Sequence, residues 1–133
     1  MKVFNNLEEM KQYYNEETNT YIFAENNRLI DIKIDFDLNI ECNIKAWNIK
    51  SLDIKACNIN SGNINACDIK ARNINSGDIN ACDIKADNIN ANNIYFNVVC
   101  FAYKTFVCES IEGRRENSKY FCLDSGVVIK NQN

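Results

Sequence analysis

The chain lacks histidine altogether, which removes the side chain that most often serves as a general base or a metal ligand. Its four glycines stand singly, so no glycine-rich loop is present to hold a phosphate group. The cysteines of the C-terminal third show no CxxC spacing, which argues against a zinc site. We therefore expect a protein that is not an enzyme and that binds no cofactor and no metal.

The sequence also lacks any run of about eighteen apolar residues, and its first residues lack the apolar segment of a signal peptide. Seven cysteines are an odd number for a disulfide framework in a chain without an export signal. These absences predict a soluble, cytoplasmic protein with no membrane contact. Its cysteines should be reduced and act as small apolar residues.

What the sequence has instead is a five-residue repeat that runs without a gap from residue 42 to residue 96. The second place of every unit is Asn or Asp, the third is Ile, and the fifth is Ala or Ser until Phe96. The eleven units are CNIKA, WNIKS, LDIKA, CNINS, GNINA, CDIKA, RNINS, GDINA, CDIKA, DNINA and NNIYF. Their isoleucines form the predicted core column: Ile44, Ile49, Ile54, Ile59, Ile64, Ile69, Ile74, Ile79, Ile84, Ile89 and Ile94.

A five-residue apolar period fits neither an α-helix nor a flat strand, whose apolar residues recur about every 3.6 and every second residue. It fits a polygonal coil in which each unit forms one side, with Ile pointing inward and Asn, Asp and Lys facing water. Neighbouring coils would stack about 4.8 Å apart through backbone hydrogen bonds. Each buried Ile would contribute about 1.5 to 3 kcal/mol, so the column should dominate the stability of an all-β solenoid.

The repeat resembles that of the pentapeptide-repeat proteins, whose unit is Ala, then Asp or Asn, then Leu, then two variable residues. The resemblance implies a right-handed quadrilateral parallel β-helix with four units per coil. One departure concerns the place two residues before Ile, where the family has a small residue and this chain has Cys, Trp47, Leu52, Gly, Arg72 or Asp87. Arg72 and Asp87 cannot enter a dry core without a partner. Either Ile and the Ala or Ser that follows it form the inward pair, or the coil is distorted at those corners.

A longer repeat is superimposed on the five-residue one, because residues 58–72 match residues 73–87 at all but two places. This spacing of 15 residues has two interpretations, a recent duplication in the gene or a coil with three sides. The resemblance implies four sides, and we therefore interpret the spacing as a duplication.

The repeat divides a single domain into three parts: an N-terminal cap of helix and strands over 1–41, the solenoid over 42–96, and a degenerate coil with a C-terminal β cap over 97–133. In the first part, Asn6 is placed to cap a short helix and Glu9 to complete a capping box. Two strands should follow, joined through residues 25–27, and the second covers residues 28–40. In the last part we expect a bulkier coil, a loop over 111–119, and strands over 119–123 and 126–130.

Residues 1–41 hold nine Asp or Glu against four Lys or Arg. Asp31, Asp35 and Asp37 alternate with apolar residues, so they would form an acidic row on the outer face of the predicted strand. Such a row is either an ordinary solvated strand face or an imitation of nucleic-acid phosphates.

Basic residues gather only after the repeat, at Arg114, Arg115 and Lys119, where they are either solvated or a weak phosphate site. The aspartates in the second place of the repeat alternate with asparagine and are interpreted as structural. The candidate partner-binding residues are Asp31, Asp35, Asp37, Glu41, Trp47, Arg72, Asp87, Arg114, Arg115 and Lys119.

Two functions fit these features. The first is a protein-binding inhibitor that blocks the nucleic-acid site of an enzyme, such as a host nuclease complex or a topoisomerase. The resemblance supports it, because pentapeptide-repeat proteins include DNA mimics that protect gyrase. The end of the chain also resembles short repeat proteins of Firmicutes phages, which favours an anti-CRISPR or anti-restriction role in the host cytoplasm. The second is a structural or self-assembling scaffold, for example a homodimer. Neither involves direct nucleic-acid binding, since the three basic residues after the repeat carry little affinity for duplex nucleic acid. The nearly neutral repeat counts against the inhibitor, because a mimic of nucleic acid should be strongly acidic.

Overall fold

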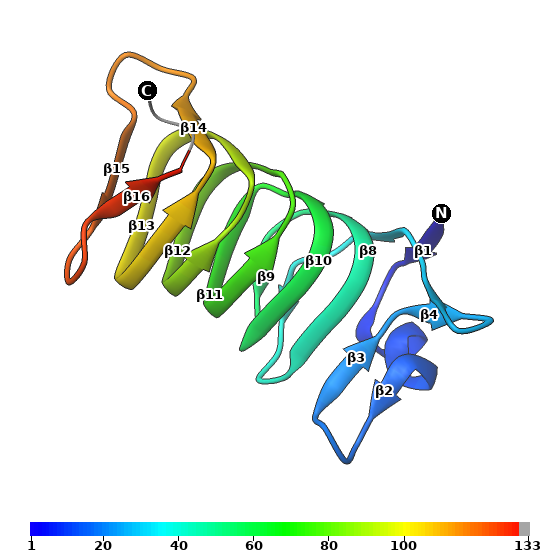
Figure 1. Ribbon diagram of the computed structural model, residues 1–133. Helices are drawn as coiled ribbons and strands as arrows, with labels where there is room; N and C mark the ends of the chain where they lie inside the picture. The colour runs from blue at the N-terminus through cyan, green and yellow to red at the C-terminus, as the bar shows by residue number, and fades with distance from the viewer. Residues whose placement is uncertain (131–133) are drawn as a thin grey trace.

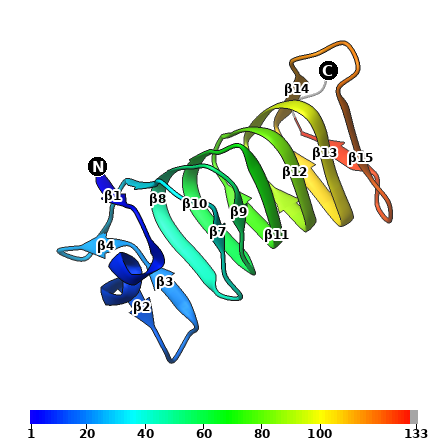
Figure 2. The same cartoon turned by 180° about the vertical axis from the view of Figure 1, so that it is seen from behind.

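The structure is a computed structural model that describes residues 1–130, and it shows stacked coils that follow an N-terminal cap (Figures 1 and 2). A short 3-10 helix, η1 (Leu7–Tyr13), lies at the N-terminal end, and the other elements are strands. The strands before the repeat are β1 (Lys2–Phe4), β2 (Tyr14–Asn15), β3 (Thr20–Ile22), β4 (Ala24–Glu25), β5 (Arg28–Leu29), β6 (Ile32–Ile34) and β7 (Leu38–Asn39). No helix within residues 1–130 is long and apolar enough to cross a membrane.

The repeat and the segment after it form the stacked coils. The strands of the repeat are β8 (Asn43–Ser51), β9 (Ile54–Lys55), β10 (Asn58–Asn65), β11 (Asp68–Ser76) and β12 (Ile79–Asn90). They are followed by β13 (Asn93–Cys108), β14 (Ser110–Gly113), β15 (Lys119–Cys122) and β16 (Val127–Ile129). Neighbouring coils pair in parallel throughout, which confirms the predicted all-β parallel solenoid.

The coils have three sides, and the expected quadrilateral is wrong. Ile59 pairs with Ile44 on one neighbouring coil and with Ile74 on the other, so one coil takes three repeat units. Side-chain hydrogen bonds between stacked residues likewise join residues 15 apart. The 15-residue spacing in the sequence is therefore the coil length, and the interpretation as a duplication without structural meaning does not hold.

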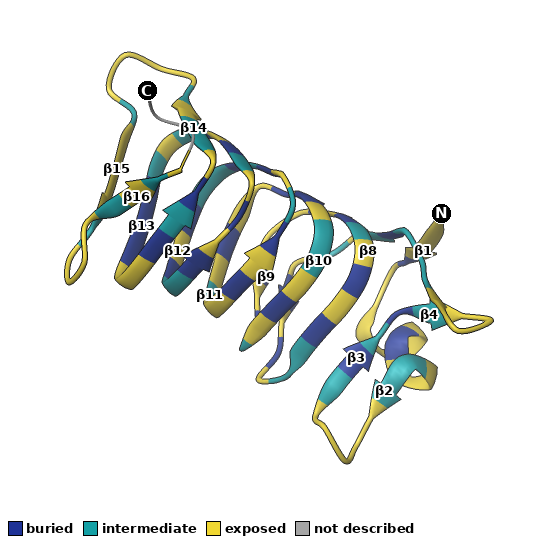
Figure 3. Ribbon diagram, in the orientation of Figure 1, coloured by how far each residue is buried: buried dark blue, intermediate teal, exposed yellow. Residues whose placement is uncertain are grey.

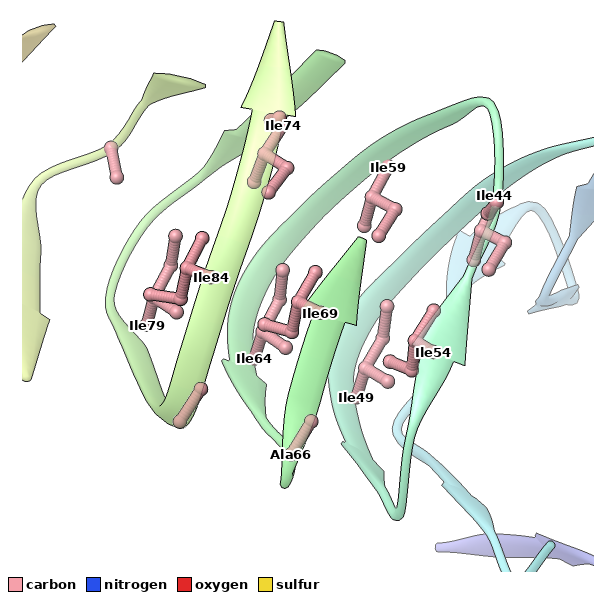
Figure 4. Close-up of a cluster of buried hydrophobic side chains, with 14 of the residues drawn as sticks. Ile44, Ile49, Ile54, Ile59, Ile64, Ala66, Ile69, Ile74, Ile79 and Ile84 are labelled. Atoms are coloured by element: carbon pink, nitrogen blue, oxygen red, sulfur yellow. The ribbon is translucent and has the colours of Figure 1, made fainter. Parts of the chain in front are cut away.

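The three sides of the coil are named here by their isoleucines. Face A carries Ile44, Ile59, Ile74 and Ile89. Face B carries Ile49, Ile64, Ile79 and Ile94. Face C carries Ile54, Ile69 and Ile84, with Leu38 before them and Cys100 after them. Figure 4 shows the isoleucines from Ile44 to Ile84 pointing into the coil in successive layers.

All eleven predicted core isoleucines are at most 2% exposed, so the register of the core column is confirmed. The Ala or Ser two places after each Ile is buried or half-buried, whereas Arg72 is exposed and Asp87 half-buried at a corner. The inward pair is therefore Ile with the small residue that follows it. Buried and more exposed residues alternate along the strands of the repeat as a result (Figure 3).

The N-terminal cap closes one end of the stack with aromatic side chains. The Asn6 side chain accepts a hydrogen bond from the Glu9 backbone N–H at 3.1 Å, as predicted, while the Glu9 carboxylate accepts from the Asn5 N–H at 2.6 Å. Met10 is fully buried, and the rings of Phe4, Tyr13 and Phe23 pack with centroids 5.3 to 5.6 Å apart. These large side chains cover the core column.

Residues 28–40 do not form the single strand that their alternation predicted. The segment begins as the second strand of the β4–β5 hairpin, whose turn holds Asn26 and Asn27 at φ of 53° and 64°. It then supplies β6 to face B and β7 to face C. The apolar residues point inward as expected, but the chain turns a corner of the coil, so its polar residues face different directions.

The coils after the repeat are wider than those within it. Asp83 pairs with Val99 and Asn88 with Thr105, so the coil lengthens by one and then two residues through irregularities in the register. Phe96, Cys100 and Phe106 are fully buried there and provide the predicted bulkier filling. β15 and β16 confirm the two expected strands, but β14 extends to Gly113, so the expected loop begins only at Arg114. The last three residues of the predicted cap lie outside the described residues.

Candidate functional site

The outer surface of the solenoid is built from columns, because each position of the repeat recurs once per coil. On face A, the residue before each Ile is Asn43, Asn58, Asn73 or Asn88. The side-chain amide of Asn58 donates to Asn43 Oδ1 at 2.9 Å, Asn73 donates to Asn58 at 2.6 Å, and Asn88 donates to Asn73 at 2.7 Å. The column is a ladder in which each internal amide both donates and accepts.

On face C the same position is occupied by carboxylates, at Asp37, Asp53, Asp68 and Asp83. We call these four residues the Asp column. Their oxygens accept backbone N–H groups from the next coil, from Asp53 to Asp37 at 3.3 Å, from Asp68 to Asp53 at 3.2 Å, and from Val99 to Asp83 at 3.2 Å. Ionised carboxylates cannot donate to one another, so the column presents unneutralised acceptors to solvent.

The crowding of like charges is visible in the middle of the Asp column. Burial raises the pKa of the Asp68 carboxyl, and the negative charges of Asp53 and Asp83 on the neighbouring coils raise it further. Asp68 thus carries an electrostatic cost that the asparagines of face A avoid.

A column of lysines runs beside the Asp column on the same face. Lys55, Lys70 and Lys85 follow the isoleucines of face C and stack in register. Within residues 1–130 the salt bridge found is Lys11–Glu8 at 2.8 Å in the N-terminal cap, so these lysines are not fixed to carboxylates. They line one side of a groove of about 610 Å³ at the corner between faces C and A.

The structure brings three of the predicted binding residues together at this groove. Glu41, Arg72 and Asp87 all line it, next to the lysine column. Their charges are mixed, so the groove has no single sign, and it lies at the edge of face C rather than across it.

The predicted acidic row of Asp31, Asp35 and Asp37 does not exist, because the chain turns between these residues. Asp31 lies on face B, where its Oδ1 accepts a hydrogen bond from the Asn48 side chain at 3.0 Å. Asp35 is exposed in the segment between β6 and β7, and Asp37 belongs to the Asp column. One of the three therefore lies on face C.

Trp47 occupies the corner between faces A and B and is 57% exposed, the largest exposed aromatic side chain of the described residues. Its backbone and ring cover Gly62, where an added Cβ would lie 2.6 Å from the Trp47 carbonyl oxygen. It lines a shallow hollow with Asp31, well separated in the fold from the groove on face C.

The predicted basic cluster is spread over the C-terminal coil. Arg114 lies over the ring of Tyr95 on face B, 5.9 Å from its centroid, and the Arg115 N–H donates to the Ser118 hydroxyl at 3.0 Å. Lys119 begins β15 and pairs with Val99 on face C. The three residues thus make separate local contacts and do not form one cluster.

Apart from Asp37, the residues of the two columns on face C are not among the candidate residues that the sequence predicts. The alternation with asparagine predicts a structural role for Asp53, Asp68 and Asp83, and the signal that sets them apart is their shared Asp-Ile-Lys context. That signal is a triplet recurring every 15 residues, which has meaning only in a three-sided coil. No group of three or more Cys, Asp or Glu side chains suited to a metal ion occurs in the described part of the chain.

The register and the burial together define the protein as a parallel β-solenoid with three-sided coils. One of its faces, face C, carries a column of carboxylates beside a column of lysines. No protein-family model, no curated protein and no solved structure matches the chain.

Proposed function

We propose that the protein is a non-catalytic binding module that docks through face C on the nucleic-acid site of an enzyme. The observation that carries the proposal is the Asp column, four carboxylates in one line with no side-chain donor between them. On face A the equivalent side chains hydrogen-bond to one another in the asparagine ladder. Face C, unlike face A, keeps a regular row of acceptors for a partner.

The Asp column shares with one strand of a nucleic acid a regular line of negative charges. Successive coils are about 4.8 Å apart, and the phosphates of one DNA strand rise about 3.4 Å per step. A partner that presents Lys and Arg side chains to a phosphate backbone could therefore contact successive carboxylates. The five-residue repeat supports the same function, because the pentapeptide-repeat proteins that it resembles include DNA mimics. A nuclease complex, including a CRISPR or restriction nuclease, or a topoisomerase is the partner class proposed, with a phage inhibitor as the biological setting.

The lysine column sets the orientation of docking. Lys55, Lys70 and Lys85 lie two residues from the aspartates, roughly 6.6 to 7 Å along each strand. A cationic site must therefore approach face C from the side of the B–C corner, where the Asp column lies. With only three lysines, one arginine and two acidic residues at the groove, direct binding of duplex DNA should be weak.

The test measures competition with DNA on purified enzymes of the proposed class, namely a gyrase, a restriction endonuclease and a CRISPR nuclease. Fluorescence anisotropy would follow displacement of a labelled duplex from each enzyme. The wild-type protein should displace the duplex from at least one of them. Changing Asp37, Asp53, Asp68 and Asp83 to Asn should weaken that displacement at least tenfold, about 1.4 kcal/mol, since it removes the charges but keeps the shape.

A matched control removes four carboxylates outside face C, through Gln at Glu16, Glu17, Glu109 and Glu112. These side chains are exposed, so the net charge changes equally while the Asp column stays intact. The control variant should compete like the wild type. Competition that survives the four Asp→Asn changes, or wild-type protein that binds the labelled duplex itself, would contradict the proposal.

A second candidate function is self-assembly, and the open C-terminal end of the stack favours it. β14, β15 and β16 pair with β13 on one side and have no strand partner on the other within the described residues. Tyr120 stands in register over the buried Cys100 yet is 42% exposed. An unpaired strand edge of this kind can pair with a second copy. Sedimentation equilibrium distinguishes the functions, because a monomer at all concentrations excludes self-assembly and leaves docking through face C intact.

A further inference from the structure

Two pairs of cysteines stack on neighbouring coils of the repeat. Cys42 and Cys57 lie at the corner between faces C and A, and Cys67 and Cys82 lie at the corner between faces B and C. In the first pair the Cys57 N–H donates to the Cys42 carbonyl oxygen at 2.9 Å, and in the second the Cys82 N–H donates to the Cys67 carbonyl oxygen. Each pair is therefore in direct register, one coil apart.

This register meets the Cα distance requirement for a disulfide bond. Stacked strands lie about 4.7 to 4.9 Å apart, within the Cα separation of about 4.4 to 6.8 Å that disulfides span. In-register residues of parallel strands project their Cβ atoms in the same direction, so the two Cβ atoms lie about as far apart as the strands, slightly beyond the roughly 3.5 to 4.5 Å of a disulfide. Closure therefore draws the two corners together by a few tenths of an ångström, without a change of coil register. None of the four residues is fully buried, and Cys67 is exposed.

The other three cysteines have no such neighbour. Cys100 stacks between Ile84 and Tyr120, Cys108 pairs with Ile129, and Cys122 pairs with Ala102. Cys100 and Cys108 are also fully buried, and burial raises the pKa of the Cys108 thiol to about 11. The seven cysteines thus divide into two stacked pairs and three single thiols.

We propose that Cys42–Cys57 and Cys67–Cys82 are two redox sites, each of which closes to a disulfide between successive coils. The oxidant is a small disulfide such as glutathione disulfide. One protein thiolate attacks its sulfur–sulfur bond, forming a mixed disulfide and releasing one glutathione thiolate. The second protein thiolate then attacks the protein sulfur and releases the other glutathione. Two protein thiols lose two protons and two electrons, and one glutathione disulfide becomes two glutathione thiols.

The exposed site, Cys67–Cys82, should close first. The attacking group is the thiolate, and the pKa of the Cys67 thiol is raised by desolvation and by the charges of Cys82, Asp53, Asp68 and Asp37. Closure should therefore be slow at neutral pH and accelerate as the pH rises. Burial and the Cys57 charge likewise raise the pKa of Cys42, while a hydrogen bond with Tyr14 opposes that rise.

Closing either site ties together residues 15 apart, which restricts the unfolded chain. The oxidised protein should therefore melt several degrees above the reduced one, and dithiothreitol should reverse the shift. Cys67 also adjoins the Asp column, so the second disulfide would hold the coils of face C together. The inference itself does not depend on the proposed function.

The experiment incubates the purified full chain with glutathione disulfide at about pH 8.5, blocks free thiols with N-ethylmaleimide under denaturing conditions, and analyses the products by mass spectrometry. Alkylation should remain at Cys100, Cys108 and Cys122. Trypsin leaves Cys57 and Cys67 on one peptide, residues 56–70, linked to peptides 34–45 and 73–85. Single-pair variants are needed to assign the bonds.

Cys57→Ser should abolish the link to peptide 34–45 and keep the link to peptide 73–85, and Cys82→Ser should do the reverse. The control Cys122→Ser should keep both links and the full melting shift. The proposal would be overturned if all seven thiols were alkylated, if links formed mainly between molecules, or if Cys100 or Cys108 replaced a member of either pair.

Discussion

Faces A and C are built from the same backbone repeat and the same buried isoleucines, yet their outer columns behave in opposite ways. On face A the amides of Asn58, Asn73 and Asn88 join into a hydrogen-bonded ladder. On face C the carboxylates of Asp53 and Asp68 accept only backbone N–H groups and repel one another. On face A the polar side chains are therefore bonded to one another, and on face C they stay open to solvent.

The largest effect expected comes from the core that both faces share. Ile69→Lys places an ammonium group where the native side chain is 2% exposed, with no carboxylate inside the coil. Burial of an unpaired charge should cost more than about 4 kcal/mol and unfold the chain. Loss of the β signal in circular dichroism would check this, with the exposed Lys70→Gln as control. An unchanged melt for Ile69→Lys would mean that the isoleucines do not face the interior.

A smaller effect should follow from giving face A the chemistry of face C. Asn73→Asp keeps the acceptor for Asn88 but loses the donor to Asn58 Oδ1, where two acceptors would then face each other at 2.6 Å. We expect the free energy of unfolding to fall by about 1 to 2 kcal/mol. Urea unfolding would measure it, and Asn75→Asp, on the same strand but outside the ladder, should change it by less than about 0.5 kcal/mol. Equal losses for the two variants would mean that the ladder contributes nothing.

The interiors behind the two faces also differ, and this difference should change the free energy of unfolding by about 1 kcal/mol or less. Ser61 and Ser76 follow face A isoleucines, and their hydroxyls are buried without a hydrogen-bond partner, whereas the residue two places after each face C isoleucine is Ala. Ser76→Ala should raise the free energy of unfolding, because it removes an unsatisfied polar group. The reverse change behind face C, Ala86→Ser, should lower it in the same urea titration. Destabilisation by Ser76→Ala would show that its hydroxyl has a partner.

The five-residue period was enough to predict the solenoid, the inward isoleucines and the small residues beside them, since those depend on local alternation. The number of sides was not, because coils of three and of four sides share that period and differ only in which distant units stack. Because a four-sided coil was expected, the sequence did not predict the Asp column. In a four-sided coil Asp53 would stack on Asn73, so the Asp column appears only at a spacing of 15 residues. The predicted acidic row of Asp31, Asp35 and Asp37 was wrong for a related reason, since the alternation of apolar and polar residues cannot reveal that a segment turns a corner of the coil.

The smallest effect expected comes from giving face C the chemistry of face A. Asp68→Asn removes the central charge of the Asp column and relieves its repulsion with Asp53 and Asp83, so it should stabilise the protein by a few tenths of a kcal/mol at pH 7. An amide at this position also gains a donor for Asp53, as in the ladder of face A. Added salt should shrink the difference, because the repulsion is screened at the surface.

The pH dependence of the stability difference between wild type and Asp68→Asn shows whether repulsion between carboxylates causes it. The pKa of Asp68 is higher in the folded chain than its ordinary value of 3.8, so folding favours the protonated form. The stability that this carboxyl contributes is fully present below the unfolded pKa and is lost as the pH rises through the folded pKa. Thermal melts between about pH 3 and 7 should therefore show wild type and Asp68→Asn diverging as the pH rises, with the variant becoming relatively more stable. A constant gap across this range would assign the effect to packing, and face C would then lack the electrostatic cost that sets it apart from face A.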